Sequence, residues 1–463
     1  MITKSIATLV LNECLSTGAD FAEIFIEETQ STSLSCDNGA IETVTSSLIS
    51  GAGIRLIKGL KSVYGSTNTI TKKGLLTLAS SLKDSLQGER ITNCKPIKKV
   101  RINKKHLPKI PYESYSKDEI ISLLKDASEA MKIDDRIVRT ICGINYNTQK
   151  VQIFNSDGKE VCDTRTRGRI NLLAVARDEN GIETAGENPG AQEGMEFFLE
   201  KNNILEMARK CAETALIMLT AKECPSGKMP VVIGNGFGGV IFHEACGHSL
   251  EATSVSKGLS VFANKIGEKI ASSIVSAVDD GTIPGGWGSG NVDDEGNPCT
   301  RNVLIKNGIL KSYMVDPFNG RRMNAQQTGC SRRQSYKFEP TSRMTNTFIL
   351  PGKHTIEEII ASVDKGLYAK SLGGGSVNPA TGEFNFAANE AYMIENGKIT
   401  YPVKGATLIG SGKEVLLKID MIGNDLKRAQ GMCGSSSGSL PVDVGQPTIR
   451  VSEMTVGGSG GKL

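Results

Sequence analysis

Residues 33–45 have the sequence SLSCDNGAIETVT, in which an Asn38-Gly39 pair separates two segments of alternating character. Asn-Gly is a favoured central pair of a two-residue hairpin turn, because both residues adopt positive φ angles there. The stretch therefore predicts a β-hairpin. Residues 21–28 alternate in the same way and residues 50–67 supply two further strands, so the hairpin belongs to an antiparallel sheet.

The same order of elements recurs about 120 residues later, around a second turn signal at Asp157-Gly158. Segments of helical periodicity flank both sets of strands, at residues 4–16 and 71–86 and again at 116–131 and 202–219. We therefore predict a degenerate duplication of a helix–antiparallel sheet–helix unit.

These signals divide the chain into an N-terminal unit, a Lys- and Pro-rich linker, a second unit and a catalytic domain, at residues 1–90, 91–115, 116–222 and 223–463. The last region consists of short β segments separated by Gly-rich turns, with a helical pattern only in one motif helix and at residues 355–366. The expected fold class is α+β, with a β-rich, barrel-like or sandwich-like C-terminal domain that carries the motif helix.

The composition is that of a globular protein, with 22% charged and 39% hydrophobic residues. A formal net charge of +4 is too small to indicate a nucleic-acid or membrane partner. There is no run of 18 apolar residues, so we expect no membrane span. Eleven cysteines without C-x-x-C pairs are typical of reduced thiols, which predicts a cytoplasmic protein.

Residues 241–253, IFHEACGHSLEAT, place His243 and His248 on either side of Glu244. In the common H-E-x-x-H zinc motif the histidines are four residues apart and share one helix face. Here they are five apart, which separates them by about 140° on a regular α-helix. A π-bulge, or a helix end at Gly247, would bring the two rings back together, so we predict an irregular backbone there.

The surroundings of the motif are otherwise apolar, so its ionisable residues are expected to face an occupied site. A buried glutamate between two buried histidines would cost several kcal/mol without partners, and a divalent cation offsets that cost. Zinc is therefore the favoured interpretation, and a structural polar network is the alternative.

A zinc site of this kind needs a third ligand. His106 lies in the linker and His354 begins an apparent helix, so neither is suitable. The remaining candidates are the nearby Glu251, Cys246, which would point away from the site, and Cys433 on a Gly/Ser-rich loop. Spacing alone does not choose among them.

Two other motifs have alternative interpretations. Gly234, Gly236 and Gly239 have the G-x-G-x-x-G spacing of a dinucleotide site, but the following residues are not a second strand that ends in an acid. These glycines are better explained by tight turning and close backbone approach. Arg332 and Arg333 either meet a substrate carboxylate or are ordinary surface charge.

Several segments resemble the TldD/PmbA family of zinc metallopeptidases, once called modulators of DNA gyrase. They include FHEACGHSLEATSVSKG, GRRMNAQQTGCSRRQSY, RMTNTFILPG and GMCGSSSGSLPVDVGQPTIRVSEMTVGG. The intact H-E-x-x-x-H motif is similar to the TldD branch. By resemblance, His243, His248 and Cys433 would be zinc ligands and Glu244 the catalytic acid/base. Glu251 also matches a family position, where it would contact one of the metal-ligating side chains rather than the metal itself.

The resemblance implies a cytoplasmic zinc peptidase that degrades or matures unfolded or short polypeptides, held as extended strands beside a sheet edge in a chamber. It also implies a dimer, either with a TldE/PmbA-like partner or with a second copy of the chain. The alternative is a non-catalytic interaction protein, a peptide binder or gyrase modulator, for which metal and Glu244 would be dispensable.

Overall fold

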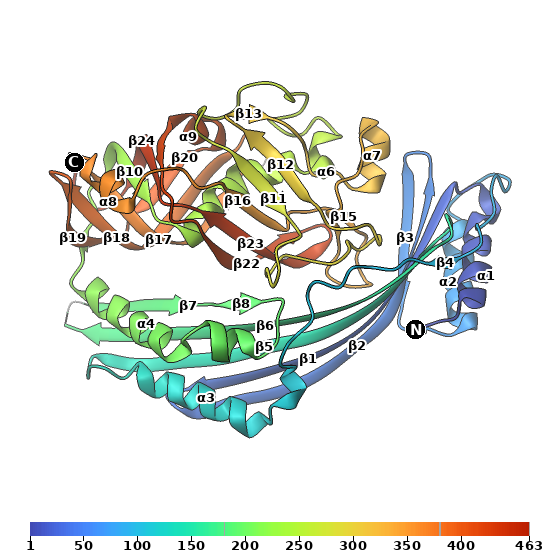
Figure 1. The fold of residues 1–463 in the computed structure, drawn as a ribbon, viewed down its shortest axis with the longest axis horizontal. Coiled ribbons are helices and arrows are strands. Elements are labelled where there is room, and N and C mark those ends of the chain that lie inside the picture. Colours follow the sequence, from blue (N-terminus) through green and yellow to red (C-terminus); the bar gives the residue numbers. More distant parts are fainter. Residues whose placement is uncertain (180, 379–380, 463) are drawn as a thin grey trace.

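One large antiparallel sheet supports a β-rich region on one of its faces (Figure 1). The computed structural model describes residues 1–179, 181–378 and 381–462. The sheet has the order β3-β2-β1-β5-β6-β4, and β7 and β8 also pair with β6. Its strands are β1 (Phe21–Asp37), β2 (Ala40–Lys58), β3 (Lys61–Thr67), β4 (Lys98–Lys99), β5 (Ile137–Asn155), β6 (Lys159–Asp178), β7 (Gly181–Glu187) and β8 (Gly190–Ala191).

Both predicted hairpins are present. β1 and β2 are joined at Asn38 and Gly39, whose φ angles are 50° and 85°. β5 and β6 are joined by residues 156–158, and Gly158 has a φ angle of 85°. The turn signals are therefore confirmed, because left-handed φ angles are what Asn-Gly and Asp-Gly favour.

The two predicted units share this sheet. β1 pairs with β5 in antiparallel register, from Glu23↔Asn155 to Asp37↔Ile141. The hairpin of the first unit is thus continued by the hairpin of the second, which local sequence patterns did not predict. The unit boundaries at residues 90, 115 and 222 stay predictions.

The four helices expected in these units are present. Each begins after a residue whose side chain accepts a hydrogen bond from the first turn, which stabilises the helix start. They are α1 (Lys4–Cys14), α2 (Lys72–Lys83), α3 (Lys117–Ala130) and α4 (Ile204–Leu219), capped by Thr3, Thr71, Ser116 and Asn203. Three short single turns complete this half: η1 (Leu15–Thr17), η2 (Tyr112–Ser114) and η3 (Phe197–Lys201).

Alternation along the strands gives the sheet two different faces. Even-numbered residues such as Ile144 and Leu172 are buried in a core with α3 and α4. Odd-numbered residues such as Phe25 and Ile153 pack instead against Tyr336 of the C-terminal region. The sheet therefore lies between two layers, with helices on one face and the C-terminal region on the other (Figure 1).

The C-terminal region contains a closed five-stranded barrel. Its strands pair in the order β17-β10-β24-β20-β18, and β17 also pairs with β18. The prediction of a barrel-like domain in an α+β fold is thus confirmed. The barrel strands are β10 (Gly227–Ile233), β17 (Lys365–Val377), β18 (Glu383–Glu395), β20 (Thr407–Ser411) and β24 (Ile449–Gly457), with β9 (Lys222–Glu223), β19 (Lys398–Lys404) and β21 (Ile419–Ile422) attached to them.

A second, six-stranded sheet lies in the same region and ends at β22, which pairs only with β23 among the described residues. Its strands are β11 (Ala277–Asp280), β12 (Arg301–Lys306), β13 (Ile309–Leu310), β16 (Asn346–Ile349), β22 (Lys427–Ser435) and β23 (Gly438–Gln446), beside a separate pair β14 (Ser331–Arg332) and β15 (Thr341–Ser342).

Short helices connect these strands. The predicted helix within residues 355–366 is α8 (Ile356–Ala361), which begins with a capping box at Thr355. Three others, of four to seven residues, were not predicted: α6 (Ala252–Val255), α7 (Pro317–Met323) and α9 (Gly412–Lys418).

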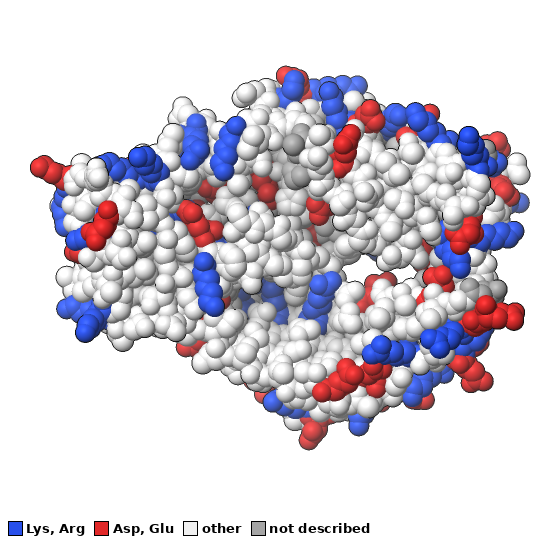
Figure 2. All heavy atoms as spheres, turned by 180° about the vertical axis from the view of Figure 1, so that it is seen from behind, with Lys and Arg blue, Asp and Glu red and all other residues white. Residues whose placement is uncertain are grey.

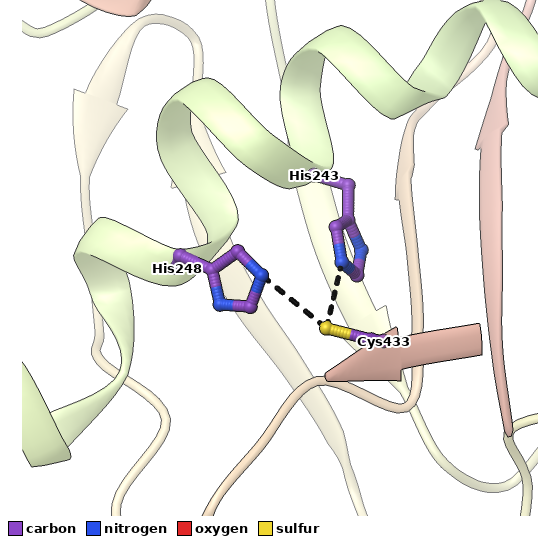
Figure 3. A group of neighbouring side chains, drawn as sticks. All are labelled: His243, His248 and Cys433. Carbon is purple, nitrogen blue, oxygen red and sulfur yellow. Dashed lines mark hydrogen bonds between the residues drawn. The ribbon is translucent and has the colours of Figure 1, made fainter. Parts of the chain in front are cut away.

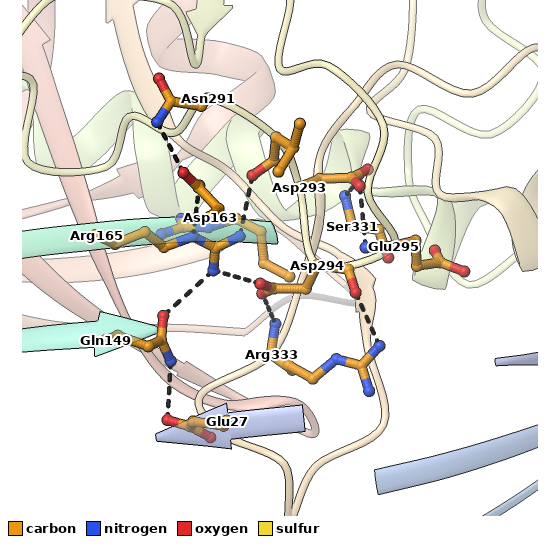
Figure 4. A network of polar contacts seen from close by, with 12 residues as sticks. Glu27, Gln149, Asp163, Arg165, Asn291, Asp293, Asp294, Glu295, Ser331 and Arg333 are labelled. Atoms are coloured by element: carbon orange, nitrogen blue, oxygen red, sulfur yellow. Dashed lines mark hydrogen bonds and ion pairs between the residues drawn. The ribbon is translucent and has the colours of Figure 1, made fainter. Parts of the chain in front are cut away.

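Buried ion pairs join the C-terminal region to the sheet (Figure 4). Arg165 of β6 donates to Asp294 at 2.5 Å, and Arg333 donates to Glu23 of β1 at 2.6 Å. Arg332 and Arg333 are 8% and 2% exposed, so their interpretation as surface charge is wrong.

Two global expectations concern membranes and thiols. Among the described residues, every helix is too short or too polar to cross a membrane. All eleven cysteines are free thiols.

Candidate metal centre

The motif segment begins where Gly-rich backbone packs tightly against its neighbours. Gly236 has a φ angle of 68°, and a Cβ atom on Gly239 would lie 2.5 Å from the backbone of Gly445. These are the tight turn and the close approach expected of the glycine cluster. They deliver a helical stretch made of η4 (Gly236–Gly239), α5 (Val240–Phe242), η5 (His243–Gly247) and η6 (His248–Leu250).

The backbone between the two histidines is irregular, as predicted. Residues His243–Gly247 form one π-helical turn, followed by a 3₁₀ turn. About 4.4 residues per turn bring positions i and i+5 to roughly 50° apart. Accordingly, the rings of His243 and His248 have centroids 5.0 Å apart at an angle of 83°.

Cys433 of β22 completes the group (Figure 3). Its Sγ atom lies 3.3 Å from Nε2 of His243 and 3.3 Å from Nε2 of His248. All three donor atoms lie within 4.8 Å of one another. His243 and Cys433 are buried and His248 is half-buried, so the cluster is largely withdrawn from solvent.

This donor set fits a zinc ion. Zn–N and Zn–S bonds of about 2.1 and 2.3 Å at tetrahedral angles place N and S donors about 3.5 Å apart, close to the spacing found here. Two imidazoles and one thiolate would leave a fourth position open, which is the arrangement of catalytic rather than structural zinc sites.

Of the other residues considered as a third ligand, only Glu251 lies close to the two histidines and Cys433. Cys246 is fully buried in the hydrophobic core, and burial raises the pKa of its thiol. His354 forms an ion-pair contact with Glu358 at 3.4 Å. His106 is buried and accepts a hydrogen bond from the backbone of Gly285.

Glu251 lies behind His248 rather than in the cluster of donor atoms. Its Oε2 is 3.2 Å from Nδ1 of His248, and its Oε1 accepts a hydrogen bond from the backbone N–H of Met344. A carboxylate on the outer ring nitrogen fixes the tautomer and orientation of the ring.

The pKa values of the two imidazoles are shifted in opposite directions. Burial holds the pKa of His243 well below its usual value, which favours the neutral form that ligates metals. Burial also lowers the pKa of His248, but the charge of Glu251 and hydrogen bonds to Cys433 and Glu251 raise it more, so the net pKa lies well above its usual value. Glu251 therefore makes His248 the more basic imidazole.

Glu244 lies beside the cluster and reaches solvent. Its Oε2 is 3.7 Å from Nε2 of His248, and its side chain is 28% exposed. Burial raises the pKa of Glu244, which the charges of His248 and Arg343 partly oppose. A carboxylate of this kind, accessible and next to the donor atoms, is suited to accept and return a proton.

Arg343 is a buried residue of the site that the sequence did not reveal. Its guanidinium donates to the backbone O of Cys433 at 2.6 Å, to Oγ of Ser437 and to the backbone O of Gly438. It thereby fixes the β22–β23 hairpin that carries the thiol. A single arginine after a serine carries no local pattern by which this role could have been predicted.

Comparison with known proteins bears on the whole chain. Three family models match in order, described as the PmbA/TldA metallopeptidase domain 1, central domain and C-terminal domain, over residues 22–86, 110–219 and 226–458. Two solved structures share the fold. A protein named as a modulator of DNA gyrase from Bacteroides thetaiotaomicron has a TM-score of 0.79 at 22% identity, covering 99% of this chain and 100% of its own. TldE from Thermococcus kodakarensis has a TM-score of 0.75 at 19% identity, covering 95% and 97%.

Curated relatives are named as proteases. The "Metalloprotease TldD homolog" of Haemophilus influenzae is 38% identical over 95% of this chain and 93% of its own length, and that of Buchnera aphidicola (Acyrthosiphon pisum) is 35% identical over 97% and 95%. The "Zinc metalloprotease TldD homolog" of Saccharolobus solfataricus is 30% identical over 66% and 68%. With this similarity along nearly its whole length, the chain belongs to the PmbA/TldD metallopeptidase family.

Proposed function

We propose that this metalloprotease is a zinc-dependent peptidase, in which His243, His248 and Cys433 hold the ion and Glu244 is the catalytic acid/base. The observation that carries the proposal is the convergence of two Nε2 atoms and one Sγ atom within 4.8 Å. They come from a π-turn with the 3₁₀ turn that follows it, and from a strand about 190 residues away. The relative from Saccharolobus solfataricus that is named as a zinc enzyme supports the choice of metal.

The residues have distinct tasks in peptide hydrolysis. When bound, zinc supplies a Lewis acid next to the scissile carbonyl and lowers the pKa of water. Glu244 accepts a proton from the attacking water at its carboxylate and returns it to the leaving amine. The Cys433 thiolate would donate more charge to a bound zinc than a third imidazole would, so proton acceptance by Glu244 should matter more.

Glu251 has a positioning role in this scheme. Its contact with Nδ1 of His248 leaves Nε2 of that ring directed at Cys433. Its other oxygen is held by the backbone of Met344, so the carboxylate does not turn toward the metal side.

The substrates are unfolded or short polypeptides, in degradation or in maturation. Support comes from β22, which carries Cys433 and pairs with no strand other than β23 among the described residues, although side chains of Arg169 and Trp287 donate to the backbone oxygens of Gln430 and Gly431. An extended peptide can add to such an edge by backbone hydrogen bonds, which do not depend on its sequence.

For the assembly we propose a dimer, with a TldE/PmbA-like partner or with a second copy of the chain. The shared fold with TldE supports a pairing between two chains of the same architecture. Eleven free cysteines support a reducing compartment, the cytoplasm.

Metal analysis and cleavage assays on the same preparation test the proposal. We expect one zinc per chain, and we expect Glu244→Gln to keep the metal while cleavage of an unfolded peptide falls by at least about 100-fold. Glu357→Gln, an exposed change on α8, is the matched control and should behave as wild type. Absence of stoichiometric zinc, or a Glu244→Gln chain as fast as wild type, would refute the peptidase mechanism and favour the non-catalytic alternative.

A further inference from the structure

A cavity of about 740 Å³ lies between the large sheet and the C-terminal region. Its floor is the odd-numbered face of β1, β5 and β6, and its walls include residues 287–294, 332–338 and the β22–β23 hairpin. Figure 2 shows basic side chains inside the hollow that separates the two layers. Six basic and three acidic side chains line it: Arg165, Arg167, Arg169, Arg332, Arg333 and Lys337, against Glu27, Asp293 and Asp294.

The arginines come largely from one strand. Arg165, Arg167 and Arg169 are alternate residues of β6, so their side chains leave the same face of the sheet. The charge of Arg165 is already neutralised by neighbouring carboxylates. Arg165 contacts Asp163 at 3.3 Å and Asp294 at 2.5 Å (Figure 4).

Three of the guanidinium groups have only neutral partners. The carbonyl oxygens of Trp287 and Ser289 accept from Arg167, and those of Asn188 and Gln430 accept from Arg169. Likewise, the carbonyl oxygens of Met344 and Pro441 accept from Arg332. Within residues 1–179, 181–378 and 381–462, no carboxylate oxygen lies within 4 Å of these three groups, although ion pairs are formed by Arg165 and Arg333 beside them.

The cavity therefore holds guanidinium groups that are positioned but not directly ion-paired, and the nearby Asp294 and Asp163 offset only part of their charge. Backbone carbonyl dipoles fix the direction of each guanidinium without cancelling its charge. Burial, together with the charges of Arg332 and Arg165, lowers the pKa of Arg167 to about 9, although the charges of Asp294 and Asp163 oppose this shift. A bound anion would relieve this repulsion, and the planar guanidinium is suited to binding a carboxylate with two hydrogen bonds.

The same arginines are attached to the hairpin that carries the metal-site thiol. Arg169 donates to the backbone O of Gln430 at 2.9 Å, and Arg332 donates to that of Pro441 at 2.7 Å. Trp287 donates to the backbone O of Gly431. Gln430 precedes Cys433 by three residues on β22, which corresponds to about 10 Å along a strand.

We propose that this cavity is a carboxylate-binding subsite of the peptidase, in which Arg167, Arg169 and Arg332 bind an acidic group of the substrate about three residues from the scissile bond. The carboxylate is an Asp or Glu side chain or the C-terminus of the peptide. The inference rests on the proposed peptidase function, because it takes the peptide to be the ligand that joins this cavity to the metal centre.

Binding is measured on a chain with Glu244→Gln, so that the result does not depend on turnover. One set of peptides is blocked at both ends and carries a single Asp, or the matched Asn, at successive positions of an uncharged scaffold. A second set has no acidic side chain and ends in a free carboxylate or an amide. We expect one position, or the free C-terminus, to bind about tenfold more tightly than its neutral match, with the gain weakened by salt.

Substitutions in the cavity identify where the gain arises. Arg167→Gln and Arg169→Gln should each remove most of the difference in affinity between the acidic peptide and its neutral match. Arg177→Gln is the matched control, an exposed arginine on the same face of β6 but outside the cavity. Circular dichroism verifies that each variant is folded. If a variant does not fold, the comparison of acidic with neutral peptides still tests the proposal, because it uses the chain without cavity substitutions.

The outcomes separate the two proposals. Equal affinity for acidic and neutral peptides at every position and at the C-terminus would overturn the subsite, whatever the cleavage assay shows. An acidic preference that Arg177→Gln reduces as much as Arg167→Gln would overturn the assignment to this cavity. A chain that prefers acidic peptides but lacks zinc or cleavage would refute the peptidase mechanism and keep the subsite.

Discussion

Sγ of Cys433 lies 3.3 Å from Nε2 of His243, although the two residues are 190 positions apart in the chain. The candidate metal centre is therefore assembled from a π-turn and the 3₁₀ turn after it at one place in the sequence, and from an edge strand at another. The contacts that hold these two segments together should control metal binding as much as the donor residues do.

Replacing the thiol tests the third ligand. We expect Cys433→Ser to weaken zinc binding by more than about 100-fold, because the soft thiolate donor is lost. Cys246→Ser is the control from within the motif, since Cys246 is buried away from the cluster. Zinc content is measured by mass spectrometry of metals and affinity by competition with a chelator. If Cys433→Ser retains full zinc, Glu251 becomes the third-ligand candidate.

Glu251 should affect metal binding through His248. Glu251→Gln removes the charge next to Nδ1 of His248 but keeps an oxygen for the backbone N–H of Met344. We expect zinc affinity to fall by about 10- to 100-fold, as is typical for the loss of a carboxylate behind a ligating histidine. Chelator competition measures the change, with Glu357→Gln on the exposed surface of α8 as the reference. Unchanged affinity would show that the contact has no such role.

Close packing of the π-turn makes Gly412 sensitive to substitution. A Cβ atom there would lie 2.4 Å from the backbone O of Ala245, inside the turn. We expect Gly412→Ala to lower the free energy of unfolding by about 2 kcal/mol through overpacking, and to weaken zinc binding by displacing the histidines. Gly374→Ala meets nothing within 4 Å and should change stability by less than about 0.5 kcal/mol. Equal melting temperatures for the two variants would contradict this account.

Asp293 should make stability depend on pH. Burial raises its pKa to about 7, although its oxygens accept hydrogen bonds from the backbone of Glu295, Asn297 and Ser331. The folded state therefore binds a proton that the unfolded state, with a pKa near 3.8, releases. The stabilisation is complete below pH 4 and is lost as the pH rises toward 7, at up to about 1.4 kcal/mol per pH unit.

Asp293→Asn removes this titration. The free energy of unfolding of the wild type minus that of Asp293→Asn, measured from pH 4 to 8, should decrease as the pH rises. The same difference should stay flat for Asp126→Asn, an exposed change on α3. Parallel pH curves for wild type and Asp293→Asn would show that the carboxylate is not held in its protonated form.

Much of this organisation could be predicted from short-range patterns. Asn38-Gly39 located a hairpin because few residue pairs adopt positive φ twice in succession. The i, i+5 spacing of His243 and His248 predicted an irregular turn because a regular helix separates those positions. Local geometry determined both features, so the sequence was sufficient.

The features that were missed depend on contacts between distant segments. No local pattern specifies that β1 pairs with β5, because the residues that pair lie more than 100 positions apart in the chain. Arg343 has neighbours that give no sign of its burial. The alternate arginines at 165, 167 and 169 were not singled out from the sequence, because the cavity they face exists only once the C-terminal region covers the sheet.

The antiparallel register between β1 and β5 has a mechanical consequence. It extends over fifteen consecutive residue pairs, from Glu23↔Asn155 to Asp37↔Ile141, without a register shift. Bending the sheet between β1 and β5 would break many backbone hydrogen bonds at once, so we expect the sheet to be rigid there and not to act as a hinge. Entry of the proposed peptide substrate would then require movement of the opposite wall, and we expect hydrogen exchange to be faster in residues 287–294 than in β1 and β5.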